Sequence, residues 1–171
     1  MLNPSSDLQR LLDAPMRPGR LVWIGLRPLR RGSVREVERA ELSPQEGLIG
    51  DHYGGRAGGQ RQVTLIAAED LAAVASFLGR PEVAPSLARR NLVVEGVNLA
   101  ALRGRFLRVG EAVLEVTGEC HPCSRMEEAP GEGGYNAFRG RGGLTARIVQ
   151  GGEIRLGDPI VRADGPGPSA A

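Results

Sequence analysis

Apolar residues recur along this chain in short runs that are separated by glycine-rich turns. Leu21–Gly25 and Gln62–Ile66 are compact apolar runs, Val34–Glu38 alternates between apolar and charged residues, and Leu92–Glu95 ends against Gly96. Runs of this length between turn residues are typical of β-strands. The pattern therefore predicts a strand at each of these places.

The second half of the chain predicts two hairpins. Each consists of two apolar runs around a turn with glycine: 106–109 with 112–117 around Gly110-Glu111, and 144–149 with 153–156 around Gly151-Gly152. Tight turns of this kind connect antiparallel neighbours. A last short strand is predicted at Ile160-Val161.

One segment has the period of a helix. Leu71, Val74, Ala75 and Leu78 follow one another at i, i+3, i+4 and i+7, and Gly79 stands just past the last of them, which is typical of a helix end. Many short strands, glycine turns and one main helix predict a mainly β fold with mixed α/β content, either a barrel or a sandwich.

The length of the chain predicts a single domain. A chain of 171 residues buries enough surface to fold without disulfide bridges. Residues 1–20 are predicted to be a leader, because Pro15 and Pro18 stop any helix there. Residues 21–162 are predicted to form the domain, and residues 163–171, rich in Gly, Pro, Ser and Ala, a disordered tail.

The sequence indicates neither a signal peptide nor a membrane span. The first residues contain no basic segment followed by an apolar one, and no apolar run approaches the ~20 residues that cross a bilayer. We therefore expect a cytoplasmic protein without a membrane partner.

Composition excludes some kinds of chemistry. All 22 basic residues are arginine, and a chain without lysine forms no Schiff base with pyridoxal phosphate or with a carbonyl substrate. The net charge is only +2, and three Phe, two Tyr and one Trp are present. Because nucleic-acid binding usually needs a strongly basic surface or stacking aromatic residues, no nucleic-acid partner is expected.

The richest chemistry lies in one segment, Gly118–Ser124, which we call the cysteine loop. It contains Cys120 and Cys123, the two cysteines of the chain, and His121, one of its two histidines. Chemistry that needs a soft nucleophile, a redox-active thiol or a soft metal ligand is therefore expected there. His121 is a weaker catalytic candidate, because its position between the two cysteines is the only argument for it.

Four interpretations of the cysteine pair are open. A thiol–disulfide redox pair usually begins a helix in a βαβ unit, whereas this pair follows a hairpin. A structural zinc site usually draws on two separated pairs of ligands, and one pair is present here. A single reactive or metal-binding thiolate fits Cys123, with Cys120 as an auxiliary thiol and Arg125 as a nearby cation. In the fourth, the protein is a non-catalytic binding module in which both cysteines only pack.

Other candidate residues lie upstream. Arg90 and Asn91 precede a predicted strand and are candidates for holding an anionic cofactor, because guanidinium groups bind phosphate through paired hydrogen bonds. The alternative is a solvated charge run at the start of a strand, and for Arg89 we prefer it. Asp51 lies beside His52 in a glycine-rich turn, where it either contributes to a cofactor site or orients the neighbouring backbone.

Several motifs then occur in a specific order. They are Gly47–Asp51, Arg61–Ile66, Arg90–Val94, Gly96–Leu99, the Gly110-Glu111 hairpin, the cysteine loop, and the glycine-flanked segment 142–158. Over roughly residues 45–160 their order and spacing resemble MOSC domains, which are named for the C-terminal domain of molybdenum-cofactor sulfurases.

The resemblance implies a β-barrel with one main helix and short additional helices, and a metal–sulfur function centred on Cys123. Family members either carry sulfur as a cysteine persulfide toward the molybdenum cofactor or bind this molybdopterin cofactor with the cysteine as molybdenum ligand. Some of the latter reduce N-hydroxylated compounds. On this interpretation the cofactor-binding candidates are Arg90, Asn91, Asp51 and Arg125.

The chain differs from the larger members of that family. It contains no aminotransferase-like cysteine desulfurase domain and no separate N-terminal β-barrel module. A cysteine desulfurase, which would carry the pyridoxal phosphate, is therefore expected as a separate sulfur donor, and a molybdoenzyme or reductase as a second partner. Whether sulfur is transferred or a nitrogen–oxygen bond is reduced stays open at this point.

Overall fold

The computed structural model describes residues 6–165. Residues 1–5 of the predicted leader and 166–171 of the predicted tail lie outside the described residues. The helices are α1 Asp7–Leu12, α2 Ala68–Phe77, α3 Arg125–Glu128 and α4 Gly134–Phe138, with 3₁₀ turns η1 Pro85–Ala88 and η2 Leu99–Leu102. The strands are β1 Gly19–Leu26, β2 Arg35–Glu36, β3 Arg39–Ser43, β4 Gly47–Leu48, β5 Val63–Ala67, β6 Leu92–Glu95, β7 Phe106–Val109, β8 Ala112–Glu119, β9 Leu144–Gln150, β10 Gly152–Arg155 and β11 Pro159–Ala163.

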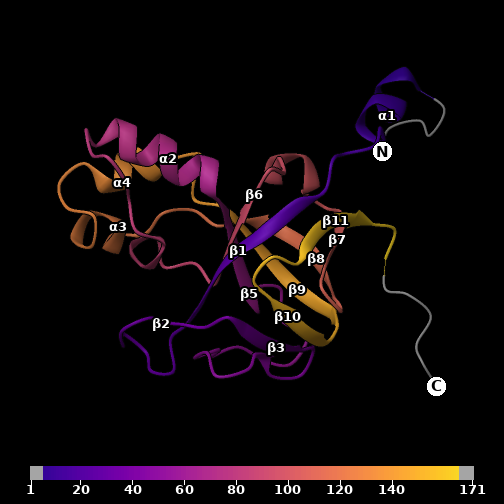
Figure 1. Cartoon of the computed structure of the whole chain (residues 1–171), viewed down its shortest axis with the longest axis horizontal. Coiled ribbons are helices and arrows are strands. Elements are labelled where there is room, and N and C mark those ends of the chain that lie inside the picture. The colour runs from indigo at the N-terminus through magenta and orange to yellow at the C-terminus, as the bar shows by residue number, and fades with distance from the viewer. Residues whose placement is uncertain (1–5, 166–171) are drawn as a thin grey trace.

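Seven strands close into a barrel in the order β11-β7-β8-β9-β5-β6-β1, and β2 extends the sheet beyond β1. The ring closes where β1 pairs with β11, with Gly19 opposite Ile160. In Figure 1, α2, α3 and α4 gather on one side of the barrel, whereas α1 lies away from them near the N-terminus. The predicted mainly β barrel with one main helix and short additional helices is thus confirmed.

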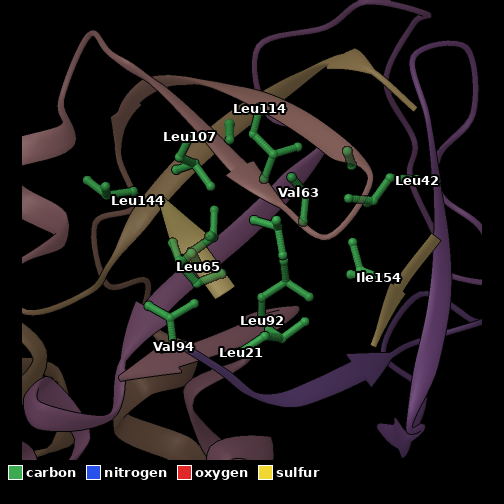
Figure 2. Packing of buried hydrophobic residues seen from close by; sticks show 14 of the residues in the cluster. Leu21, Leu42, Val63, Leu65, Leu92, Val94, Leu107, Leu114, Leu144 and Ile154 are labelled. Carbon is green, nitrogen blue, oxygen red and sulfur yellow. The ribbon is translucent and has the colours of Figure 1, made fainter. Parts of the chain in front are cut away.

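Several barrel strands are buried on both faces, which explains their nearly continuous apolar runs. Leu65 and Leu92 belong to the cluster that fills the barrel interior, where Figure 2 shows their side chains converging. Ile66 and Val93, one residue further along the same strands, belong to a second cluster with residues of α2, α3 and α4. Because side chains alternate across a strand, each strand contributes to both clusters.

The main helix is the crossover of a parallel strand pair. Leu65 of β5 is opposite Leu92 of β6, and the two strands run in the same direction, so a long connection is required between them. α2 supplies it and carries Glu69 and Asp70 in its first turn, where the helix dipole favours negative charge. The connection then returns through η1, which ends at Arg89, just before β6.

One predicted hairpin is wrong. β9 pairs with β8 and β5, whereas β10 pairs with β3, so the two strands around Gly151-Gly152 do not pair with each other. A Cβ on Gly152 would lie 2.6 Å from the Cβ of Glu111, and one on Gly151 would lie 2.6 Å from the carbonyl oxygen of Leu42. This close packing directs the chain away from β9 into a second sheet, β10-β3-β4.

The second sheet is tied to the barrel by a buried glutamine. The side chain of Gln62 donates a hydrogen bond to the carbonyl oxygen of Pro44 at 2.7 Å and accepts one from the N–H of Ile148 at 2.9 Å. Because both polar ends of the amide are satisfied, the burial of Gln62 is not penalised.

None of the helices within residues 6–165 combines the length and the apolar character that crossing a bilayer requires.

Candidate functional site

The cysteine loop connects β8 to α3 and presents its two thiols differently. Cys120 is buried and its N–H donates to the carbonyl oxygen of Gly143 at 2.8 Å, whereas Cys123 is exposed. The N–H of Met126 donates to the carbonyl oxygen of Cys123 at 2.8 Å, and the Met126 side chain is fully buried. Cys123 is therefore an accessible thiol on a backbone that is anchored on both sides.

Five arginines surround this loop, and we call them the arginine cluster: Arg27, Arg61, Arg89, Arg90 and Arg125. Arg61 donates to the Sγ of Cys120 at 4.0 Å, and the Arg27 guanidinium donates to the carbonyl oxygen of Arg89 at 3.2 Å. Within residues 6–165 no member forms an ion pair with Asp or Glu. The cluster is thus an uncompensated positive region beside the thiols.

The electrostatic effects on two members confirm that the cluster is compact. The pKa of Arg89 is lowered, first by burial and then by the positive charges of Arg27 and Arg125, while the negative charge of Cys123 opposes this shift. The pKa of Arg90 is also lowered, mainly by burial, while Cys120 and then Cys123 oppose this shift. Like charges have been brought within electrostatic reach of one another, and an anion at this place would relieve their repulsion.

Arg89 has an unusual backbone. It follows η1 with a left-handed conformation, at φ 56°, which a residue with a Cβ adopts at a cost of about 1–2 kcal/mol. The half-buried Arg89 side chain lies within electrostatic reach of Cys123. The sequence favours a solvated charge run at Arg89, whereas this geometry makes Arg89 a stronger candidate for ligand contact.

The polar side-chain groups of Arg90 and Asn91 form hydrogen bonds within the fold. Arg90 is 6% exposed and donates to three backbone carbonyl oxygens. The side-chain oxygen of Asn91 accepts from the N–H and the hydroxyl of Thr64, both at 3.0 Å, which ties β6 to β5. Contact of either residue with a cofactor stays a prediction.

Asp51 acts on the backbone of a cluster member. Its carboxylate accepts from the N–H of Arg27 at 2.6 Å, and the N–H of His52 donates to the carbonyl oxygen of Arg27 at 2.6 Å. The two bonds hold Arg27 from both sides. Of the two roles expected for Asp51, the structure displays the orienting one.

His121 points to a carboxylate. Its side chain is 78% exposed, and its Nε2 lies 3.7 Å from the carboxylate of Glu119. Its catalytic role is a prediction that rests on its position beside the cysteines.

One hollow borders the cysteine loop, and a second one borders Arg61 of the arginine cluster. A cavity of about 60 Å³ on the Cys120 side is bounded by Cys120, His121, Pro122, Asp70, Leu99 and Leu144, among others. Ligand pockets usually measure about 300 Å³ or more, so this cavity is too small for a cofactor. An open hollow of about 700 Å³ lies beside Arg61, with Arg147 and the glycine-rich segment 53–60 in its walls. Its size is within the ligand range.

The donor set of a structural zinc site is not assembled. Over the described range, 6–165, no three His, Cys, Asp or Glu side chains come together as metal ligands. The arrangement instead offers one exposed thiol within a positive environment.

A family model, described as MOSC domain, matches residues 50–161. The chain belongs to the MOSC domain family. The match includes Arg61, Arg89, the cysteine loop and every barrel strand after β4 except the last residues of β11. A search of curated proteins found no match.

Solved structures share the fold of this MOSC domain. The YuaD protein from Bacillus subtilis has a TM-score of 0.72 at 18% identity, with 84% of this chain and 94% of that chain covered. YiiM from Escherichia coli has a TM-score of 0.65 at 19% identity, covering 84% and 69%, and YiiM from Geobacillus stearothermophilus has 0.67 at 19%, covering 85% and 75%. These identities show a common fold.

The MOSC family is linked to proteins of the molybdenum cofactor. Sequence reasoning selected Cys123 and Arg125 as candidates and did not select Arg27 or Arg61 as site residues. Arg27 follows β1 and has no motif of its own, whereas Arg61 precedes β5 and opens the motif Arg61–Ile66.

Proposed function

We propose that this MOSC domain binds the molybdenum cofactor at the arginine cluster, with the Cys123 thiolate as a ligand of the metal. The observation that carries the proposal is an exposed thiol among five arginines that have no carboxylate partner within the described residues. A pterin cofactor with a phosphate group is an anion of the kind that such a region attracts.

The donor set fits this cofactor chemically. Thiolate sulfur is a soft ligand that suits a thiophilic metal, and guanidinium groups pair with phosphate oxygens through two parallel hydrogen bonds. Arg89 and Arg125 are half-buried and Arg61 is exposed, so each retains access to a ligand. Arg90, Asn91 and Asp51 then hold the surrounding backbone in place.

When bound, the cofactor would supply a redox-active metal centre. The residues of the chain would bind the phosphate, orient the pterin and place Cys123 beside positive charge. Reduction of N-hydroxylated compounds is the reaction we would test first on a loaded protein, with an external reductase as electron source.

Sulfur carriage is a second candidate function, favoured by the exposure of Cys123 next to a buried Cys120. In that reaction the Cys123 thiolate attacks the outer sulfur of a donor persulfide, and the donor leaves as a thiolate. The donor would be a cysteine desulfurase, which carries the pyridoxal phosphate that this lysine-free chain does not bind covalently.

Arginine variants test the anion site. We expect Arg89→Gln and Arg125→Gln each to raise the dissociation constant for a phosphorylated pterin about tenfold, because each removes a charge-assisted contact. Arg139→Gln removes an exposed arginine outside the cluster and is the matched control, with an expected change below about twofold. Pterin fluorescence during titration measures all three.

Two results decide this test. Weaker binding in the two cluster variants alone, with a further loss at high salt, would support the site. Equal affinity in Arg89→Gln, Arg125→Gln and Arg139→Gln would show that the cluster does not hold the pterin.

A further inference from the structure

Arg90 is a buried cation, and the part of the chain that the structure describes gives it no carboxylate partner. Among residues 6–165 it forms no ion pair with an acidic side chain. Its guanidinium donates to the carbonyl oxygens of Gly142 at 2.6 Å, Cys120 at 3.1 Å and His121 at 3.5 Å. Burial of a charge is costly, so this position calls for a function that only the cation performs.

The three acceptors belong to two separate segments. Cys120 and His121 lie in the cysteine loop after β8, and Gly142 lies in the turn before β9. The segments touch: a Cβ on Gly142 would lie 2.0 Å from the carbonyl oxygen of Cys120. Arg90 therefore bridges them at a point of very close approach. The rigid planar fork of arginine suits this geometry, whereas a lysine ammonium is a compact point charge.

Two of the carbonyl groups that Arg90 contacts, those of Cys120 and His121, lie just before Cys123 in the chain. Arg90 holds the carbonyl groups of residues 120 and 121, and only Pro122, whose ring fixes φ, separates them from Cys123. On the other side, the buried Met126 holds the carbonyl oxygen of Cys123 through its N–H. Loss of the Arg90 bridge would free one of the two anchors of the reactive thiol.

We propose that Arg90 is a positioning residue that clamps the cysteine loop to the turn before β9 and thereby fixes the place where Cys123 is presented. The proposal rests on the proposed function for the importance of Cys123, and it assigns Arg90 to the loop backbone while Arg89 and Arg125 contact the anion. The lowered pKa of Arg90, caused by burial and opposed by both cysteines, is consistent with a buried cation close to the two thiols.

Amide hydrogen exchange on the ligand-free protein tests the clamp. In Arg90→Gln we expect the Cys120 amide, which donates to Gly143, to exchange about tenfold faster, because a hydrogen bond from a charged group is lost. Arg90→Lys should not restore the native rate, because lysine restores the positive charge but not the planar guanidinium group. Arg89→Gln should leave the rate unchanged. The alkylation rate of Cys123 by iodoacetamide should change in the two Arg90 variants and stay native in Arg139→Gln, which removes an exposed arginine outside the cluster.

Two other results would contradict the proposed role of Arg90. A native exchange rate in folded Arg90→Gln would do so, and full rescue by Arg90→Lys would show that charge alone matters. If Arg90→Gln does not fold, Gly142→Ala probes the same contact from the other side, because its Cβ displaces the Cys120 carbonyl group. Native Cys120 exchange in folded Gly142→Ala would then refute the proposal.

The same variants separate this proposal from the proposed function. If the native protein fails to bind the phosphorylated pterin while the exchange pattern appears as expected, cofactor binding is refuted and the clamp stands. If pterin binding depends on Arg89 but the Arg90 variants exchange like the native protein, the clamp is refuted and cofactor binding stands.

Discussion

Three consecutive residues before β6 have three different environments. Arg89, in a left-handed conformation, is half-buried near Cys123, Arg90 is buried against backbone carbonyl groups, and Asn91 is enclosed between strands. The left-handed residue turns the chain sharply after η1, so the neighbouring side chains diverge. A run that looks like one basic patch in the sequence is therefore divided between a position near Cys123, contacts with loop carbonyl groups, and sheet structure.

Asn91→Ala is expected to lower the free energy of unfolding by about 2–4 kcal/mol, because it leaves the N–H and hydroxyl of Thr64 without their buried acceptor. Asn98→Ala is the matched control. The Asn98 side chain is exposed and accepts only from the N–H of Ala100, so a loss of about 1 kcal/mol is expected. Urea denaturation measures both, and equal losses would contradict the buried role of Asn91.

At the residue scale, the sequence indicated candidate residues from local motifs, both in the cysteine loop and at Asp51, Arg90 and Asn91. Cys120, His121, Cys123 and Arg125 could be selected together because they are neighbours. Arg61 reaches Cys120 and Arg27 reaches the carbonyl oxygen of Arg89, each from a distant strand end, and their contribution depends on barrel closure. Local patterns contain no information about that closure.

The elements that carry the site meet at the ends of barrel strands. Arg27 follows β1, Arg61 precedes β5, Arg89 precedes β6, the cysteine loop follows β8, and Gly142 precedes β9. Strand ends fix the bases of these loops, so side chains on short connections are positioned by the rigid barrel.

The glycine turn before β9 contacts the cysteine loop, since the carbonyl oxygen of Gly143 accepts a hydrogen bond from the N–H of Cys120. Gly143 has φ 84°, and a Cβ there would lie 2.0 Å from the carbonyl oxygen of Leu65. Gly143→Ala is expected to cost about 3 kcal/mol or more, from backbone strain together with overpacking. Free energies of unfolding from urea titrations measure this cost.

Gly58→Ala is the control for Gly143→Ala. Gly58 also has a positive φ, 66°, but its Cβ would meet open space, so only the backbone cost of about 1–2 kcal/mol remains. Similar losses for both variants would mean that the turn before β9 is not tightly packed.

At the element scale, apolar runs located the barrel strands because burial on alternating faces sets their composition, but no run predicted β3 or β4 of the second sheet. The pairing of β10 could not be predicted from its turn. Gly151-Gly152 looked like a hairpin, but contacts with Glu111 and Leu42 direct β10 to β3. Strand pairing of this kind is decided by tertiary packing rather than by local propensity.

At the scale of the whole molecule, the barrel brings together charge that is scattered in the sequence. The chain has a net charge of only +2, yet five arginines from four places in the sequence gather beside the cysteine loop. The overall architecture could be predicted because the motif order resembled a family. The charge distribution could not, since it arises only when distant strand ends meet.

The central claim is that Cys123 holds the metal of a molybdenum cofactor. Its most direct test is the molybdenum content per chain, by elemental mass spectrometry, of purified native protein, Cys123→Ser and the control Cys120→Ser. We predict about one molybdenum per chain in the native protein and in Cys120→Ser, and a loss of most of it in Cys123→Ser, because a hydroxyl replaces the soft thiolate ligand. Molybdenum retained in Cys123→Ser, or zinc without molybdenum in the native protein, would contradict the claim.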